Sequence, residues 1–317
     1  MRNIFKKLFA IAFGVVLALV LLEIACQAFF AFGVKPKLKA LQSDPFHYYQ
    51  PSADAVLVYE LKPGYRILKD GRRIAIDSRG LRDDGEHANA PHKVALLGDS
   101  VPFGTALSQE DTPSAALQAL TGDSVKVLNF GTPGYGLEEI RRYFEVKCPA
   151  YKPDDVFYLL NINDFSRRNT IYEGGDNGLY RIYHPPFLKM PFFIRKAIYR
   201  FEKGGEMSSV RWYQWLYEGN KADVGMIKDM AATAAANGCR FTVVLFPPAV
   251  AYQNGGFALQ SVFDKIERHL DENGISWLAP VADFSQNISS LQDNTDHFTP
   301  AGSRKMAEVI YENLRQQ

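Results

Sequence analysis

The sequence predicts an α/β domain built on a parallel sheet of about five strands with helices on both faces, preceded by one transmembrane helix. From residue 93 onward, short apolar runs alternate with stretches of helical spacing, a pattern typical of parallel strands joined by helices. An apolar stretch, Leu8–Val34, lies ahead of them. Hydrophobic residues make up 47% of the 317 residues and charged residues 22%, the balance of a folded globular protein.

The amino-terminal segment, residues 1–34, is expected to be an uncleaved signal anchor. Its apolar stretch of 27 residues, at about 1.5 Å per residue, exceeds the roughly 30 Å thickness of a hydrocarbon layer. A cleaved signal peptide is the rival interpretation, but Glu23 lies where a cut after Ala25 would require a small residue. Glu23 also takes the place of the aliphatic side chain that a lipoprotein site at Cys26 would require.

The position of this stretch in the chain predicts the topology. The seven-residue leader before it is too short to form a domain, and such a leader usually stays in the cytoplasm. Basic residues flank the stretch on both sides, so the positive-inside rule hardly discriminates. We therefore expect residues 8–34 in the inner (cell) membrane and residues 35–317 outside it, in the periplasm of a Gram-negative cell.

The composition disfavours two further kinds of protein. The 36 basic and 35 acidic side chains leave a net charge of +1, so no nucleic-acid partner is expected. Of the three cysteines, Cys148 and Cys239 lie outside the anchor, either as separate buried thiols or as one disulfide between neighbouring loops. Neither has a histidine close to it in sequence, which argues against a thiol nucleophile.

The part of the chain after the anchor is expected to divide into an irregular segment with a hairpin, residues 35–92, and one catalytic domain, residues 93–317. The hairpin is expected at the alternating run Arg72–Ile76. The strands of the domain are expected at Val94–Leu97, Val125–Leu128, Val156–Leu160, Phe241–Phe246 and Ile275–Leu278. Helices are expected to begin at Thr112-Pro113 and Thr299-Pro300, where a capping hydroxyl precedes a proline, and to cover 137–146, 222–237 and 259–272.

The connection between the third and fourth strands, residues 165–221, is too long for a bare crossover. It is rich in aromatic residues, and prolines interrupt any single helix within it. Two interpretations follow. The connection forms either a helical subdomain that buries its own aromatic side chains, or a lid or substrate wall over the active site.

Ser100 is the candidate nucleophile and His297 the candidate base. Gly98-Asp99-Ser100 directly follows the first strand, at the edge of a parallel sheet where chemistry gathers. Among the six histidines, His297 is distinguished by its place just before the last helix, with Asp293 and Asp296 beside it. A base needs a partner that orients its far nitrogen, which a loop leading into a helix can supply.

Two further strand ends could stabilise the oxyanion of a tetrahedral intermediate. Asn129-Phe130-Gly131 ends the second strand and Asn161–Asp164 ends the third, so both fall on the same rim as Ser100. We predict an oxyanion hole made of the N–H groups of Ser100 and Gly131 and the side-chain amide of Asn163.

These four elements together resemble the blocks of the SGNH (GDSL-like) hydrolases, which begin with Gly-Asp-Ser, a glycine, an Asn-Asp and a late histidine. The stretches Gly98–Gly104 (GDSVPFG) and Asn129–Gly136 (NFGTPGYG) resemble a bacterial branch that has an amino-terminal membrane anchor. The resemblance covers residues 93–164 and 293–312. It implies a three-layer α/β/α fold of the flavodoxin-like SGNH type and a Ser-His-Asp hydrolase.

The late block departs from the family's Asp-x-x-His pattern, because the residue three before His297 is Asn294. We favour Asp293 as the acid, since a one-residue bulge would bring it to the ring, with Asp296 as the alternative. A role for Asn294, or a dyad without an acid, stays open.

The expected function is hydrolysis of ester bonds by two-step acyl transfer, as a carboxylic or O-acetyl esterase of the cell envelope that needs no metal and no cofactor. The expected substrate is a small-molecule or glycan ester. Three alternatives are a polysaccharide O-acetyltransferase, a non-catalytic binding module of the envelope that retains the fold, and a phospholipid hydrolase. The lack of a long amphipathic basic helix in the sequence argues against the last of these.

Overall fold

The computed structural model describes residues 2–44, 46–83, 90–166, 187–202, 209–293 and 296–316. The chain divides into two compact units. The first, here called the anchor unit after the predicted signal anchor, holds residues 1–47 and 169–206. The second, here called the catalytic unit after the predicted nucleophile and base, holds residues 48–168 and 207–317. The connection at 165–221 is thus shared between the two units.

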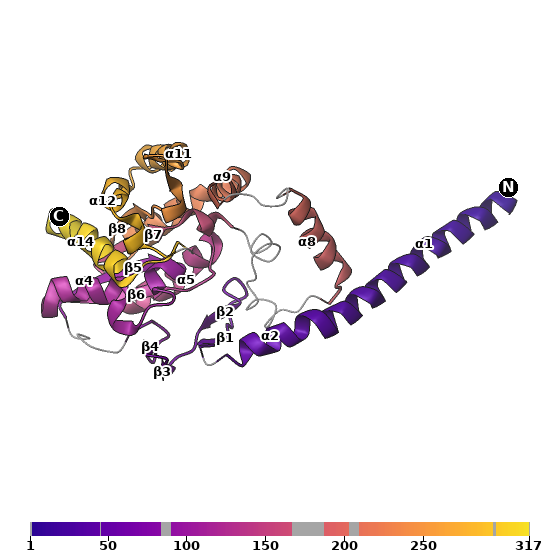
Figure 1. The fold of residues 1–317 in the computed structure, drawn as a ribbon, viewed down its shortest axis with the longest axis horizontal. Coiled ribbons are helices and arrows are strands. Elements are labelled where there is room, and N and C mark those ends of the chain that lie inside the picture. The colour runs from indigo at the N-terminus through magenta and orange to yellow at the C-terminus, as the bar shows by residue number, and fades with distance from the viewer. Residues whose placement is uncertain are drawn as a thin grey trace. The chain divides into compact units, whose positions relative to one another are not determined.

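One long helix opens the anchor unit (Figure 1). It consists of α1 (Arg2–Phe29), a π-helical turn η1 (Phe30–Val34) and α2 (Lys35–Gln42). The expected apolar helix is therefore present, and it continues beyond Val34 to Gln42. By length and composition, it is a candidate membrane span. The unit also contains α8 (Met190–Glu202), which packs on α1.

Five strands form a single parallel sheet in the order β11-β8-β7-β5-β6. They are β5 (His92–Gly98), β6 (Val125–Gly131), β7 (Asp155–Leu160), β8 (Arg240–Leu245) and β11 (Ser276–Leu278). The predicted parallel sheet is confirmed. Because β6 and β7 lie on opposite sides of β5, the strand order reverses there, and crevices at such switch points are where doubly wound sheets bind ligands.

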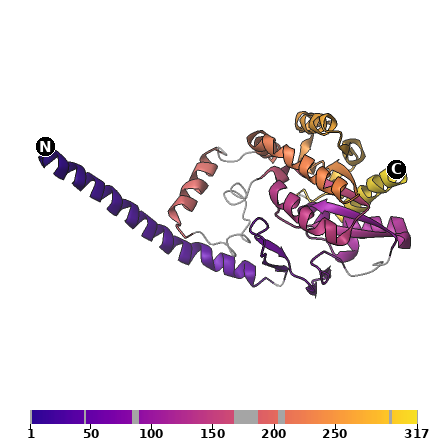
Figure 2. The same ribbon diagram turned by 180° about the vertical axis from the view of Figure 1, so that it is seen from behind.

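The two faces of the sheet carry separate halves of the core, because side chains alternate along each strand. On one face Val94 of β5 belongs to an apolar cluster with Leu117 of α4 (Pro113–Thr121) and Met306 of α14 (Pro300–Gln316). On the other face the ring of Phe144 in α5 (Leu137–Tyr151) lies 6.2 Å from that of Phe241 in β8. Figures 1 and 2, seen from opposite sides, show helices over both faces, which is the expected three-layer arrangement.

The helices of the catalytic unit connect these strands. Thr112 caps α4 by accepting the N–H of Ala115, as the Thr-Pro pattern predicts. The helical elements are α3 (Ser100–Phe103), η2 (Gln109–Asp111), α4 (Pro113–Thr121), η3 (Gly122–Ser124), α5 (Leu137–Tyr151), η4 (Ile162–Phe165), α9 (Ser209–Asn220), η5 (Lys221–Val224), α10 (Gly225–Ala236), η6 (Ala249–Ala251), α11 (Gln260–Glu272), α12 (Val281–Ser285), α13 (Ile288–Leu291) and α14 (Pro300–Gln316).

The described residues of the catalytic unit also form three antiparallel hairpins. Their strands are β1 (Tyr49–Pro51) with β2 (Tyr59–Leu61), β3 (Arg66–Lys69) with β4 (Arg72–Ala75), and β9 (Tyr252–Gln253) with β10 (Gly256–Phe257). The first packs against the loop after β6, because Tyr59 donates its O–H to Pro133 O at 2.9 Å. The second joins η2, since Arg73 N–H donates to Ser108 Oγ at 3.1 Å. Both hairpins therefore support loops on the rim of the sheet.

Cys148 and Cys239 are free thiols whose Sγ atoms lie 3.6 Å apart. Cys148 belongs to α5, and Cys239 immediately precedes β8. Burial raises the pKa of the Cys148 thiol to about 12. Of the two arrangements considered from the sequence, the structure has the buried thiols, although they are neighbours rather than separate.

Gly302, in the first turn of α14, offers a test of how tightly this unit is packed. A Cβ atom at Gly302 would lie 1.8 Å from Leu291 O of α13, an obstacle of backbone that cannot rotate away. We expect Gly302→Ala to lower the free energy of unfolding by about 3 kcal/mol, the upper end of the cost of overpacking. Urea unfolding of the detergent-solubilised protein, followed by circular dichroism, measures this.

Gly225→Ala is the matched control. Gly225 begins α10 in ordinary helical conformation, and a Cβ atom there would meet nothing within 4 Å. This variant should be neutral or more stable by about 0.4–1 kcal/mol, because alanine reduces the entropy of the unfolded chain. Equal stability of the two variants would contradict the packing described for α13 and α14.

Candidate active site

The candidate nucleophile lies where the chain turns from β5 directly into α3. Gly98 has a φ of 148°, and a Cβ atom there would lie 2.9 Å from Pro102 Cγ and 3.0 Å from Leu159 O. Asp99 caps the new helix, since its Oδ1 accepts the N–H of Val101 at 2.9 Å. Ser100 is therefore the first residue of α3, beside the switch point of the sheet.

Ser100 and His297 are brought into hydrogen-bond contact across 197 positions of sequence. His297 Nε2 lies 2.9 Å from Ser100 Oγ, within the reach that a general base requires. The hydroxyl has a second acceptor in Asp99 Oδ2, at 3.1 Å. Ser100 is 9% exposed. The predicted nucleophile and base thus form the pair from which acyl transfer can start.

A short loop between α13 and α14 holds His297. Asp293 and His297 exchange two hydrogen bonds: Asp293 N–H donates to His297 O at 2.8 Å, and His297 N–H donates to Asp293 Oδ1 at 3.0 Å. The next residue, Phe298, is buried with its ring 5.1 Å from that of Phe246. These contacts fix the backbone of His297 between a closed turn and the core.

Both carboxylates predicted beside His297 are found there, but their surroundings differ. Asp293 Oδ1 receives the His297 N–H described above. Asp296 has a left-handed φ of 59°, and its two oxygens accept the Val250 N–H at 3.2 Å and the Tyr213 O–H at 3.1 Å. Burial raises the pKa of Asp296, against the effects of these two donors and of His297. Which carboxylate orients the ring remains a prediction, and Asn294 lies outside the described residues.

The N–H of Gly131, predicted as an oxyanion donor, is already engaged. It donates to Asn129 Oδ1 at 2.9 Å, while Asn129 Nδ2 donates to Pro102 O at 2.8 Å and to Ser114 Oγ at 3.0 Å. A Cβ atom at Gly131 would lie 2.2 Å from Phe103 N. The structure therefore gives Gly131 a packing role against α3, and its role toward an oxyanion remains a prediction.

Asn163 and Asp164 occupy η4, directly after β7. Among the described residues no group donates to the buried Asn163 Oδ1, so this oxygen can still accept a hydrogen bond, while donation from the amide to an oxyanion remains a prediction. Asp164 Oδ2 accepts the Tyr158 O–H at 2.8 Å and the Asn161 N–H at 3.1 Å. Burial, followed by the charge of Asp99, raises the pKa of Asp164 well above its ordinary range. This favours a neutral carboxylic acid beneath the site.

Arg82 holds the loop after α3 and was not identified from the sequence. It is 1% exposed and donates to the carbonyl oxygens of Phe103, Gly104 and Leu107 at 2.7–2.8 Å. Burial lowers the pKa of Arg82 to about 10, so the guanidinium stays charged at neutral pH. Its acceptors are backbone groups 21 to 25 residues away, which leave no pattern in the sequence.

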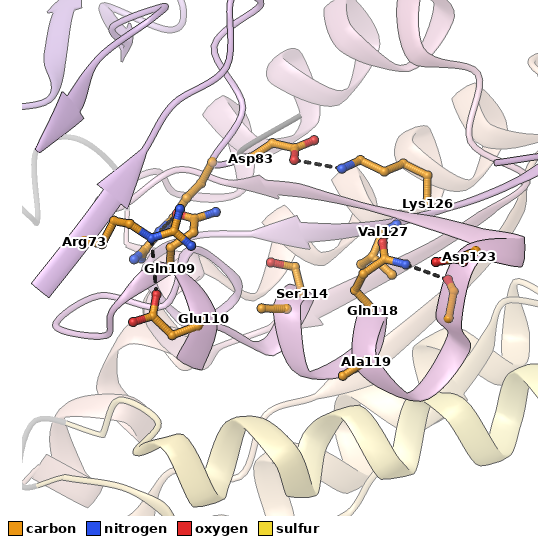
Figure 3. Close-up of a pocket in the computed structure, with 13 residues that line it drawn as sticks. Arg73, Asp83, Gln109, Glu110, Ser114, Gln118, Ala119, Asp123, Lys126 and Val127 are labelled. Atoms are coloured by element: carbon orange, nitrogen blue, oxygen red, sulfur yellow. Dashed lines mark hydrogen bonds and ion pairs between the residues drawn. The ribbon is translucent and has the colours of Figure 1, made fainter. Parts of the chain in front are cut away.

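Arg82 also borders a polar pocket of about 460 Å³, shown in Figure 3. The pocket contains an ion pair in which Lys126 Nζ lies 2.7 Å from Asp83 Oδ1. Ser100 and His297 are not among its described lining residues. The pocket is therefore distinct from the candidate active site.

Comparison with known proteins returned similar solved structures. No protein-family model and no curated relative matches the chain. A lipolytic protein of the G-D-S-L family from Desulfitobacterium hafniense is 16% identical, with a TM-score of 0.43 over 69% of this chain and 98% of the other. A carbohydrate acetylesterase family member from Sinorhizobium meliloti is 14% identical, with a TM-score of 0.42 over 71% and 98%. An acetylxylan esterase from Geobacillus stearothermophilus, in a catalytic mutant form, is 15% identical, with a TM-score of 0.43 over 70% and 94%.

Substitutions at Asp293 and at Asp296 are expected to lower kcat to different extents. We expect Asp293→Asn to lower kcat on the order of 10³- to 10⁴-fold, the cost of removing the carboxylate behind a catalytic histidine. Asp296→Asn should cost far less, because Tyr213 and Val250 already bind both oxygens of Asp296. Steady-state hydrolysis of an activated ester by each variant measures this.

Tyr213→Phe is the control for Asp296, since it removes one donor and leaves both carboxylates in place. We expect the kcat of Tyr213→Phe to fall by about the same factor as that of Asp296→Asn. A larger loss in Asp296→Asn than in Asp293→Asn would reverse the assignment of the acid.

Asp164 predicts a pH dependence of stability. Because its pKa is raised on folding, the folded protein binds this proton more tightly than the unfolded chain does. The resulting stabilisation is fully present below the ordinary value of 3.8 and is lost as pH rises through the raised pKa. We expect the Tm of Asp164→Asn to rise relative to wild type between about pH 4 and pH 7.

Calorimetric Tm values across this range test the expectation, with Asp123→Asn as the control because Asp123 is exposed. The control should keep a constant offset from wild type. A constant offset for Asp164→Asn as well would show that its carboxyl is not held neutral in the folded protein.

Proposed function

We propose that the chain is a serine hydrolase of ester bonds, a carboxylic or O-acetyl esterase anchored at the cell envelope. One observation carries the proposal: Ser100 Oγ lies 2.9 Å from His297 Nε2 at the carboxyl end of a parallel sheet. Two carboxylates accompany the imidazole, and the N–H groups that begin α3 lie beside the hydroxyl. A nucleophile, its base and candidate orienting groups therefore stand in one place.

In the proposed mechanism, Ser100 Oγ attacks the ester carbonyl carbon while His297 Nε2 takes the hydroxyl proton. The oxyanion forms beside the Ser100 N–H and the Asn163 amide, and Gly131 can join them by exchanging Asn129 Oδ1 for the oxyanion. His297 then protonates the leaving alcohol, and the acyl group remains on Ser100. Water, activated by the same imidazole, releases the acid and restores the hydroxyl.

The proposed substrates are small O-acyl esters, with O-acetylated glycans of the envelope as the first choice. The low exposure of Ser100 favours a compact acyl group such as acetyl. A glycan substrate agrees with the location that we propose: residues 8–34 in the inner membrane and the catalytic unit on its outer side. The apolar helix α1 supports the anchor part of this proposal.

The function is tested with a panel of p-nitrophenyl esters from acetate to longer acyl chains, together with acetylated xylan. We expect wild type to prefer the short esters, and Ser100→Ala and His297→Ala each to lose activity by about 10³-fold or more. Ser124→Ala, which changes an exposed serine in η3, should keep wild-type activity.

Two outcomes would replace the proposal. Transfer of acetyl groups to added acceptor sugars, faster than hydrolysis, would make the protein a polysaccharide O-acetyltransferase using the same site. A folded wild-type protein whose Ser100 does not react with a fluorophosphonate probe would make it a non-catalytic binding module.

A further inference from the structure

Glu23 of the anchor helix binds the beginning of α8, a contact between segments that are more than 160 residues apart. Its Oε1 accepts the N–H of Lys189 at 2.8 Å, and its Oε2 accepts the N–H of Met190 at 2.8 Å. Gln27 donates to Glu23 Oε1 at 2.6 Å and to Phe187 O at 2.9 Å. A carboxylate at a helix N-terminus satisfies N–H groups that lack intrahelical acceptors and is favoured by the helix dipole.

Aromatic contacts extend this junction along the anchor. The rings of Phe29 and Phe193 lie 5.3 Å apart at 74°, and those of Phe30 and Phe192 lie 6.3 Å apart at 88°. Both pairs have the edge-to-face geometry that aromatic rings prefer. The first turn of α8 is therefore held on the anchor helix by polar and by apolar contacts.

Several apolar side chains of this segment are exposed. Phe187 is 90% exposed, and Ile194 and Ile198 are 46% and 50% exposed. The two isoleucines are four positions apart, so they lie on one side of the helix. The sequence of α8, MPFFIRKAIYRFE, also contains three basic residues against one acidic residue. Exposed apolar side chains with a basic excess are typical of helices that lie in a membrane surface.

The position of Glu23 along α1 determines the depth in the bilayer at which α1 contacts the start of α8. If the hydrocarbon layer begins at Leu8, about 20 helical residues reach its far boundary near Gln27. Glu23 and Gln27 then fall at this boundary, and Phe29 and Phe30 lie beyond it among the headgroups. A charge at such a depth is costly unless it is paired, and the start of α8 supplies the donors.

From these observations we infer that α8 is a second membrane element: an interfacial helix, tied to the anchor by Glu23, whose exposed apolar side lies in the lipid headgroup region. The occupant of that side is a bilayer surface containing anionic lipid. The inference rests on the proposed membrane span of α1 and is independent of the esterase activity. It gives one part of the long connection between β7 and β8 a membrane role.

The test uses the full-length protein in nanodiscs of phosphatidylethanolamine and phosphatidylglycerol. The photoreactive residue p-benzoylphenylalanine replaces Ile198 in one variant, exposed Val16 of α1 in a second and exposed Leu120 of α4 in a third. After irradiation, mass spectrometry detects covalent lipid adducts. We expect adducts at positions 198 and 16 and none at position 120.

Adducts at 16 without adducts at 198 would overturn the interfacial role of α8 and leave the anchor intact. An absence of adducts at both positions would overturn the membrane span as well, whereas adducts at all three would show contact without selectivity and would also overturn the inference. Esterase activity, measured separately, is unaffected by any of these outcomes.

The role of Glu23 is tested in the Ile198 variant. Glu23→Ala removes both acceptors, and we expect it to lower the adduct yield at position 198 by about thirtyfold, the ratio that corresponds to two lost hydrogen bonds of ordinary net strength. Glu23→Gln keeps one acceptor oxygen and should lose less. An unchanged yield in Glu23→Ala would show that Glu23 does not tether α8.

Discussion

The close approach of α3 to the ends of β5 and β6 is the constraint on which the candidate site depends. The register of the sheet pairs Gly98 with Gly131, and a side chain at either position would collide with α3. The helix can therefore begin immediately after β5 and place Ser100 at the strand-order reversal. The position of the predicted nucleophile follows from backbone packing, and the same packing brings the Asn129 side chain onto Pro102 O.

Buried polar groups next to α3 and η4 stabilise this arrangement. Arg82 donates hydrogen bonds to three carbonyl oxygens of the loop after α3. Asp164 accepts the Tyr158 O–H and the Asn161 N–H, and these two bonds hold the turn that carries Asn163. Asp99 lies close enough to Asp164 for the charge of Asp99 to raise the pKa of Asp164. The hydrogen bonds of Arg82 and of Asp164 Oδ2 rigidify their surroundings, whereas Asp164 Oδ1 is buried without a partner among the described residues. The rim is thus organised by groups that do not themselves react.

The parts of the structure that were predictable from the sequence are those coded by local patterns. Five apolar runs became the five strands, and Thr112 caps α4 as its Thr-Pro signal indicates. Ser100 could be identified because it directly follows the first strand, and His297 because it precedes the last helix with two aspartates beside it. Arg82, Tyr213 and the contact between Glu23 and α8 could not be predicted, since each acts on groups distant in sequence with no characteristic spacing. Local sequence patterns therefore identify the predicted catalytic residues more readily than the residues that position them.

The connection between β7 and β8 shows how one insertion can serve two purposes. Its helix α9 belongs to the catalytic unit and donates the Tyr213 hydroxyl to Asp296, while α8 belongs to the anchor unit and binds Glu23. The two interpretations drawn from composition, a helical subdomain and a lid or substrate wall, stay predictions, because residues 167–186 and 203–208 lie outside the described part of the chain. Because the two contacts lie in separate compact units, a substitution at Tyr213 acts on the loop that carries His297, and one at Glu23 acts on the long amino-terminal helix. The proposed attachment to the membrane and the proposed chemistry of Ser100 can therefore be altered independently.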